Sequence, residues 1–312
     1  MSLTVEKPGL QTTLQGAPRR GYRHMGVPWS GPADAVSMAL ANRLVGNQAE
    51  TIALEITLGG FVAKFDRAGW IGLTGAPAPA RLNGRPVAYH TTLKIRGGDR
   101  LELDPPARGT RTYLAIAGGF ATDELLGSGS TYLPAQLGGH EGRVLQAGDV
   151  LSVLSYVVER PIFSTPQEHR PHIGNSHMLR AVVSAETDLL SPASKTALFE
   201  TAWTAGRAAS RMGLRLGGPK LDLTSDGQMN SAAVFPGIVQ CAEDGQSIAL
   251  MTDGQTTGGY PRICAVISCD LHLLGQVRPG DTVKFLARNQ DLAREDNRAK
   301  AAFLESWLSP AI

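Results

Sequence analysis

Short apolar runs alternate with clusters of Gly and Pro along most of the chain, and this pattern predicts strands rather than helices. In the first half we expect strands at 53–58, 61–65, 70–74, 81–82, 92–95, 100–103, 112–117 and 150–158. In the second half we expect them at 178–183, 214–216, 237–240, 248–251, 263–267 and 282–286. With 36 Gly and 19 Pro in 312 residues, turns are frequent enough to join such short strands, so the predicted fold class is mainly β.

Three stretches carry helical signals. Asp34 is well placed as an N-cap, and Ser191-Pro192 is a favourable N-cap and first-turn pair. A closing helix is expected from about 291 to 308 because apolar residues recur there at helical spacing. The residues of this apolar stripe are Leu292, Ala299, Phe303 and Trp307. We expect residues 1–7 to be a loose end.

The chain length suits two domains of ordinary size, each with its own core. The stretch 160–176 holds three Pro and lacks apolar periodicity, so we take it as the linker. The predicted domains are 8–160 and 177–288, followed by a C-terminal helix within 289–312.

The turns and strands repeat in order between the two halves, about 180 to 190 residues apart. The matching pairs are 21–23 with 213–215, 71–74 with 248–252, and 97–101 with 279–283. Each match is weak alone, but the common order predicts two related β barrels in tandem.

The stretch 253–261, Asp-Gly-Gln-Thr-Thr-Gly-Gly-Tyr-Pro, lies between two apolar runs. Its Gly-Gly pair permits a close backbone approach, and its amide and hydroxyl groups offer uncharged hydrogen-bond partners. It is either an ordinary hairpin loop or part of a binding site. Ligands often bind between packed domains, so we expect 253–261 and the glycine-rich stretch 21–34 to form two walls of one cleft.

Charge and composition exclude several classes of partner. The formal net charge is +2 and no run of Lys or Arg is present, so neither nucleic acid nor a membrane is expected as a partner. The N-terminus lacks a signal pattern, which makes the cytoplasm the expected location.

Cysteine and histidine residues do not form a convincing metal site. Cys241, Cys264 and Cys269 lack the spacing of metal ligands, and we interpret them as buried reduced thiols. The linker histidines His169 and His172, with His177 just beyond, lack a carboxylate pattern beside them. We therefore predict no metal.

Two motifs are absent from the sequence, one for binding nucleotide phosphates and one for carrying biotin. The sequence has no Gly-x-x-x-x-Gly-Lys-Ser/Thr motif, which binds nucleotide phosphates. It also has no Met-Lys-Met tripeptide of the kind that carries biotin, so any covalent carrier must come from another chain.

Several segments resemble the allophanate hydrolase subunit 2 family, also called the 5-oxoprolinase C-subunit or biotin-dependent carboxyltransferase-like family. The matching segments are 9–13, 21–28, 30–34, 54–55, 59–60, 127–128, 130–133, 211–213, 236–240 and 255–261. They follow the family's order through nearly the whole chain, and Gln-Thr-Thr-Gly-Gly-Tyr-Pro at 255–261 is the most diagnostic.

This resemblance implies two cyclophilin-like β barrels with a substrate cleft between them. It implies work in a complex with a smaller companion of the subunit 1 type and, in one branch, a third lactam-utilising subunit. That branch opens 5-oxoproline to glutamate with ATP, and we take it as the predicted function. The alternatives are the carboxyltransferase component of a urea-carboxylase-like enzyme, which takes carboxyl from a partner's carboxybiotin, and a regulatory protein that antagonises a subunit 1 type kinase inhibitor.

A small amide or urea-like substrate would be polarised by hydrogen-bond donors held on rigid loops. The predicted catalytic residues are Asp34 and Glu55, as candidate bases, and Tyr260. Each has a structural alternative: Asp34 as a helix cap, Glu55 as the partner of an Arg, and Tyr260 as an aromatic at a strand edge. The predicted substrate-binding residues are Arg23, His24, Ser130, Tyr132, Arg211, Gln240, Gln255, Thr256, Thr257, Gly258 and Gly259.

Three glycines depart from the family pattern. Many relatives carry a charged residue at the positions of Gly16, Gly129 and Gly254. At the positions of Gly129 and Gly254 the residue in many relatives is Arg. A site that lacks both arginines should hold an anion less well, so either the substrate differs or a partner carries the chemistry.

Overall fold

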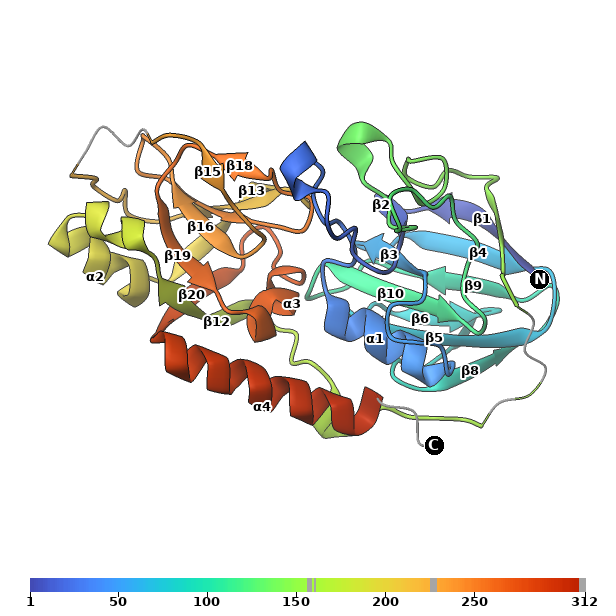
Figure 1. The fold of residues 1–312 in the computed structure, drawn as a ribbon. Helices are drawn as coiled ribbons and strands as arrows, with labels where there is room; N and C mark the ends of the chain where they lie inside the picture. Colours follow the sequence, from blue (N-terminus) through green and yellow to red (C-terminus); the bar gives the residue numbers. More distant parts are fainter. Residues whose placement is uncertain (156–158, 160, 225–228, 309–312) are drawn as a thin grey trace. The chain divides into compact units, whose positions relative to one another are not determined.

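The computed structural model describes residues 1–155, 159, 161–224 and 229–308. These residues form two compact units (Figure 1). Unit 1 comprises Met1–Arg19, Ser30–Ile173 and the described residues from Leu304 on, and unit 2 comprises Arg20–Trp29 and Gly174–Phe303. Compared with the predicted domains 8–160, 177–288 and 289–312, segment 20–29 is grouped with the second half, the chain up to Ile173 is grouped with the first, and the C-terminal segment is divided after Phe303.

Unit 1 contains two antiparallel sheets. The first has the order β11-β1-β4-β9-β6-β7, and the second has the order β2-β3-β10-β5-β8. The strands of the first are Val150–Ser152 (β11), Ser2–Pro8 (β1), Phe61–Phe65 (β4), Arg100–Leu103 (β9), Ala80–Leu82 (β6) and Arg85–Pro86 (β7). Those of the second are Gln11–Gln15 (β2), Ala53–Thr57 (β3), Arg111–Ile116 (β10), Gly69–Gly75 (β5) and Thr92–Ile95 (β8).

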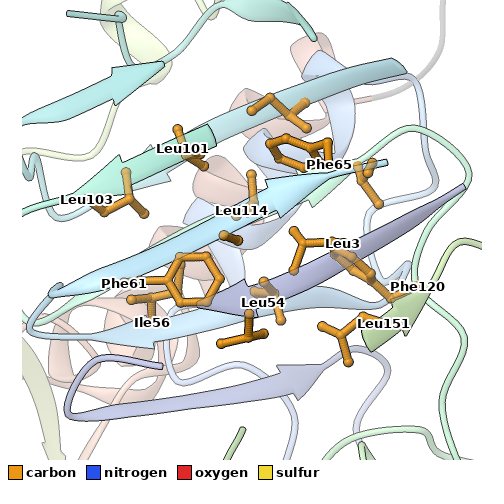
Figure 2. Close-up of a cluster of buried hydrophobic side chains, with 14 of the residues drawn as sticks. Leu3, Leu54, Ile56, Phe61, Phe65, Leu101, Leu103, Leu114, Phe120 and Leu151 are labelled. Atoms are coloured by element: carbon orange, nitrogen blue, oxygen red, sulfur yellow. The ribbon is translucent and has the colours of Figure 1, made fainter. Parts of the chain in front are cut away.

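One hydrophobic core joins the two sheets (Figure 2). Phe61 and Phe65 of β4 come from the first sheet, and Leu54 of β3 and Leu114 of β10 come from the second; all four side chains are fully buried. Burial of apolar surface at about 25 cal/mol per Å² makes this cluster the main stabilising element of unit 1.

The prediction of a loose end at residues 1–7 is wrong. These residues form most of β1, which pairs with β4 on one side and β11 on the other. Leu3 and Val5 alternate with polar residues and are buried in the core. This alternation of buried and exposed side chains, with a period of two residues, is typical of a strand.

Helix α1, Ala35–Leu44, covers the face of the second sheet opposite the core. Its Met38 and Ala41 pack in a second cluster with Trp70 and Tyr113. A Cβ at Gly72 of β5 would lie 2.7 Å from the carbonyl oxygen of Ala41, so glycine is needed for this close approach of helix and sheet.

Unit 2 is a closed barrel with the order β12-β19-β16-β17-β14-β13-β20, in which β12 and β20 pair in parallel and close the ring. Its strands are Ser176–Val183 (β12), Arg262–Val266 (β19), Ile238–Cys241 (β16), Ser247–Leu250 (β17), Gly213–Gly217 (β14), Trp203–Ala209 (β13) and Thr282–Arg288 (β20). The predicted fold class, mainly β with tandem barrels, a few short helices and a C-terminal helix, is confirmed, although unit 1 encloses its core with two separate sheets.

One of the two short α-helices of unit 2 begins where its sequence signal places it. Helix α2, Pro192–Glu200, starts after the predicted N-cap, since the Ser191 side chain accepts a hydrogen bond from Ser194 N–H. A short helix α3, Leu271–Leu274, was not predicted.

The closing helix α4, Gln290–Leu308, is confirmed, but its predicted apolar stripe is wrong. Leu292 and Phe303 are 47% and 38% exposed, while Ala293 is buried. Polar contacts hold the helix instead: Asp296 pairs with Arg180 and Arg288.

None of the described helices has the length and apolar content needed to cross a membrane.

The Gly-Asp turn recurs with the same local structure at three places. Gly98, Gly148 and Gly280 have φ of 90°, 95° and 92°. The Asp that follows each glycine accepts a hydrogen bond from the backbone N–H three residues before it. The sequence match between 97–101 and 279–283 therefore reflects one recurring turn that precedes β9 in unit 1 and β20 in unit 2.

Part of the predicted linker is an ordered edge of unit 1. Residues 163–165 lie along β8, where Thr92 N–H donates to the Phe163 carbonyl and Thr165 N–H donates to the His90 carbonyl. His90 has φ of 59°, and its buried Nδ1 lacks a hydrogen-bond partner among the described residues. Burial and, to a smaller extent, the nearby Arg170 charge lower the pKa of His90 to about 4.

We predict that His90 makes unit 1 sensitive to acid. The unfolded chain should protonate near pH 6.5 but the folded chain only near pH 4, so stability is full above about pH 6.5 and is lost as the pH falls toward 4. The loss is at most about 3 kcal/mol. His90→Asn, which tolerates positive φ, should flatten the dependence of the thermal unfolding midpoint on pH over this range.

The exposed His172 provides the matched control, His172→Asn, which should keep the wild-type pH dependence. An equal slope for His90→Asn and wild type would contradict the prediction.

Candidate functional site

The stretch 251–261 crosses the end of a barrel strand. Its flanking strands, β17 and β19, both hydrogen-bond to β16, which lies between them. The alternative of an ordinary hairpin is therefore wrong, because hairpin strands would pair with each other. The connection must pass over β16.

Within this connection, β18 (Thr257–Gly258) pairs with β15 (Ala232–Ala233) to form a small two-stranded ribbon. The backbone of Val234 donates to Thr256, and that of Met229 donates to Gly259, which extends the pairing at both ends. We call residues 229–235 and 255–260 the ribbon. Its backbone hydrogen bonds give the loop a fixed shape.

A buried ion pair fixes the chain just before residues 255–260 of the ribbon. Arg211 and Asp253 are 4% and 1% exposed, and the guanidinium forms two hydrogen bonds to the carboxylate, from Nε at 2.7 Å and Nη2 at 3.0 Å. Asp253 N–H also donates to the Arg211 carbonyl. Arg211 was predicted to hold a substrate anion, but its fork is occupied by the chain's own carboxylate.

The predicted residue Gln240 supports the ribbon from below. It lies on β16, is 1% exposed, and donates from Nε2 to the Tyr260 carbonyl at 3.0 Å. Its Oε1 accepts a hydrogen bond of 3.3 Å from Gln255 Nε2. The side-chain amides thus connect the buried Gln240 beneath the ribbon to the exposed Gln255 of the ribbon.

The segment 20–29 supplies a cationic clamp to the same ribbon. The Arg23 guanidinium donates from Nη2 to the carbonyls of Val234 and Gln255, one from each strand of the ribbon. It also stacks on the rings of Trp29 and Phe235, at 5.2 and 4.8 Å from their centroids. Burial lowers the pKa of this guanidinium from its ordinary value. The expected proximity of segment 21–34 and loop 253–261 therefore holds for Arg23.

Exposed groups of the ribbon carry no charge. Gln255, Thr257 and Tyr260 are exposed, and Gly258 and Gly259 are half-buried. Thr256 is buried, while His24 is exposed in the 3-10 turn Arg23–Met25. The ribbon therefore presents amide, hydroxyl, phenol and backbone groups to solvent, which can bind a neutral polar molecule.

Unit 1 holds the two predicted bases in a buried network. Asp34 caps α1: its Oδ1 accepts from Ser37 N–H and its Oδ2 from the Ser37 hydroxyl. Glu55 Oε2 accepts from Ala33 N–H and from the Tyr113 hydroxyl, and its Oε1 lies 3.2 Å from Arg111 Nε. Both structural alternatives, the helix cap and the Arg pair, are thus present.

Tyr113 is the centre of this network and was not predicted. Its hydroxyl donates to Glu55 and accepts from Asp34 N–H. Burial, followed by the charges of Glu55 and Asp34, raises the pKa of Tyr113 well above its ordinary value, so the phenol stays protonated. The catalytic roles of Asp34 and Glu55 remain predictions.

Ser130 and Tyr132 also lie in unit 1. The fully buried Ser130 hydroxyl accepts from Gly16 N–H and donates to the Ala17 carbonyl. Tyr132 is half-buried and its backbone forms an isolated antiparallel β-bridge with Leu137. The guanidinium of Arg19 donates to the carbonyl of Ser130 and so fastens the chain just before segment 20–29. The predicted residues thus form one set in each unit, and the cleft between the barrels remains a prediction.

The three unusual glycines are closely packed. A Cβ at Gly16 or Gly129 would lie 2.4 or 3.0 Å from Ile52 Cδ1, so one apolar side chain fills the space beside both. A Cβ at Gly254 would lie 2.9 Å from the Met212 carbonyl oxygen. A side chain added at Gly16 or Gly129 would therefore displace other side chains, whereas one added at Gly254 would meet the backbone.

The cysteines are free, and Cys241 and Cys264 are buried, as predicted, while Cys269 is partly exposed. Burial raises the pKa of Cys241 and Cys269 to about 11 and that of Cys264 further, which disfavours nucleophilic thiolates. Among the residues that the structure describes, no group of three His, Cys, Asp or Glu side chains is arranged to hold a metal. His177 instead forms a buried contact with Asp281.

A pocket of about 440 Å³ lies away from these residues, between α2 and the 3-10 turn Ala185–Leu189. Asp188 and Lys195 form an exposed ion pair in its wall. It contains none of the predicted site residues, so the ribbon remains the candidate site.

Sequence reasoning missed Tyr113, Arg111, Trp29 and Phe235. Tyr113 lies in the predicted strand 112–117 and Arg111 directly precedes it, so core packing was the role expected for both. Trp29 lies between two matching segments, inside the glycine-rich stretch 21–34, but nothing local indicated its contact with a ring more than 200 residues away.

The sequence and the fold are similar to those of known proteins. Residues 25–287 match the family model described as carboxyltransferase domain, subdomain A and B. The structure of the Kluyveromyces lactis urea carboxylase superposes with a TM-score of 0.92 at 29% identity, covering 98% of this chain and 29% of that one. The chain belongs to the carboxyltransferase-domain family.

Two curated relatives differ in how much of their length this chain spans. The C-subunit of 5-oxoprolinase from Escherichia coli K12 is 36% identical over 308 residues, which cover 97% of this chain and 96% of the relative. The urea amidolyase of Lachancea kluyveri is 32% identical over 97% of this chain but only 18% of its own length.

We predict that the Arg211–Asp253 pair is required for the stability of unit 2. Asp253→Asn leaves a buried guanidinium without its carboxylate and should lower the free energy of unfolding by about 3–5 kcal/mol. Removal of both charges in Arg211→Gln with Asp253→Asn should recover part of this loss. Chemical denaturation measures both effects.

The control is Asp188→Asn, which breaks the exposed pair with Lys195 and should change stability little. If Asp253→Asn unfolds at the same denaturant concentration as this control, the buried pair does not support the ribbon.

Proposed function

We propose that this chain is a subunit of an ATP-dependent amidohydrolase complex that opens the lactam ring of 5-oxoproline to glutamate. The observation that carries the proposal is the match to the 5-oxoprolinase C-subunit over 97% of this chain and 96% of that relative. A chain of the same extent as that relative is expected to need the same kind of partners, a subunit 1 type companion and a lactam-utilising subunit.

The ribbon supports this proposal chemically. Lactam opening builds negative charge on an amide oxygen, which fixed hydrogen-bond donors stabilise best when they need no rearrangement. Thr257 and Tyr260 are exposed donors on a framework held by Gln240, Arg23 and the buried ion pair. Asp34, Glu55 and Tyr260 are kept as proposed catalytic residues.

ATP is proposed to be a substrate bound by a partner subunit, because this chain lacks a phosphate-binding glycine motif. No covalently bound cofactor is proposed for this chain.

A second candidate is the carboxyltransferase component of a urea-carboxylase-like enzyme. The TM-score of 0.92 to a urea carboxylase favours it. Carboxybiotin would then be a substrate delivered by a partner, and urea would be the acceptor.

Reconstitution tests the first proposal. The purified chain should neither hydrolyse ATP nor form glutamate from 5-oxoproline, and the mixture with both companion subunits should do both. Omission of this chain should abolish the coupled activity, because the complex would lack the ribbon. The assay follows phosphate and glutamate release together.

Other outcomes separate the alternatives. Carboxylation of urea by carboxybiotin, with no release of glutamate, would favour the carboxyltransferase function. A complex that assembles but shows neither activity would contradict both and favour a regulatory role for partner binding.

A further inference from the structure

The amides of Gln240 and Gln255 form a hydrogen-bonded chain that begins at a backbone carbonyl. Gln240 Nε2 donates to the Tyr260 carbonyl at 3.0 Å. Gln240 Oε1 in turn accepts from Gln255 Nε2 at 3.3 Å. Gln240 is buried beneath the ribbon, whereas Gln255 is exposed.

The chemistry of the three groups fixes the orientation of both amides. A backbone carbonyl only accepts, so the Gln240 atom that faces Tyr260 must be its NH₂ group. The other end of Gln240 is then its oxygen, which also only accepts. Gln255 must therefore turn its own NH₂ group toward Gln240, which leaves Gln255 Oε1 available for another partner.

The surrounding backbone keeps this arrangement in place. A Cβ at Gly258 would lie 2.8 Å from Gln240 Nε2, so glycine at this position leaves room for the buried amide. Arg23 donates to the Gln255 carbonyl at 3.3 Å and restrains the backbone that carries the exposed amide. The direction of Gln255 is thus set by the buried Gln240 amide and by the half-buried Arg23.

We propose that Gln255 recognises the substrate's amide N–H through Oε1, and that Gln240 is the positioning residue that fixes this orientation. The inference rests on the proposed function and narrows its substrate class to lactams, ureas or amides that keep a hydrogen on nitrogen. An N-methylated analogue cannot donate to Oε1 and leaves that acceptor without its partner.

Turnover by the reconstituted complex gives the first test. Wild type should prefer 5-oxoproline over N-methyl-5-oxoproline in kcat/KM by about 10- to 100-fold. Gln255→Met should reduce this ratio toward one by slowing 5-oxoproline alone. Gln240→Met should also reduce the ratio, whereas a purely structural defect would slow both substrates equally.

Gln246→Met is the matched control, because Gln246 lies outside the ribbon and its Oε1 accepts from Arg215. It should keep the wild-type ratio. An unchanged ratio in Gln255→Met would overturn the inference, even if the activity itself confirmed the proposed function.

A binding measurement tests the inference without turnover. The side-chain NH₂ signal of Gln255 in the isotope-labelled isolated chain, assigned with Gln255→Met, should shift with 5-oxoproline or urea. It should not shift with N-methyl-5-oxoproline or tetramethylurea. Equal shifts with the methylated ligands, or no shift with either N–H ligand, would overturn the inference, whereas an inactive complex with selective shifts would overturn only the proposed function.

Discussion

The position of β16 between β17 and β19 constrains the whole candidate site. Because both neighbours use their hydrogen bonds on β16, the chain that joins them has to cross the end of this strand. The crossing brings residues 251–261 over Gln240, which projects from β16 and binds the Tyr260 carbonyl. A buried ion pair at one end and the pairing of β15 with β18 then hold the crossing in one shape. Such a rigid support suits the polarisation of an amide group, since the donors must be in place before charge develops.

The positive charges near the ribbon serve the protein's own structure. Arg211 is neutralised by Asp253, and Arg23 binds two backbone carbonyls and two aromatic rings. The exposed groups of the ribbon itself are uncharged, and Gly254 is packed too closely for a side chain to be added without movement of the backbone. This division agrees with a substrate recognised through hydrogen bonds. The anion-binding roles that the sequence indicated for both arginines would require these internal contacts to be broken.

The strands that sequence patterns predicted are those with compact apolar runs. β4, β8 and β9 have the predicted bounds, because apolar residues run through β4, alternate with polar residues in β8 and β9, and are followed by turn residues. β13 was missed because Trp203–Ala209 contains little more than Trp and Ala as apolar residues. β15 and β18 are two residues long and carry no periodic signal. In α4 the apolar residues recur at helical spacing in the sequence, but Leu292 and Phe303 are exposed, and Asp296 instead pairs with Arg180 and Arg288.

The sequence by itself determined the mainly-β fold, the caps of α1 and α2, the recurring Gly-Asp turn and the polar, glycine-containing loop 253–261, because each depends on neighbours close in the chain. Only the tertiary structure decided which charges are neutralised and which amides are oriented. Asp253 meets Arg211 across 42 positions, and Arg23 meets Val234 across 211. Such pairings follow from the order of strands in the barrel, and no local pattern specifies that order. For the same reason, Gln240 and Gln255 were both among the predicted substrate-binding residues, but only the hydrogen bonds of the folded chain fixed which end of Gln255 is free.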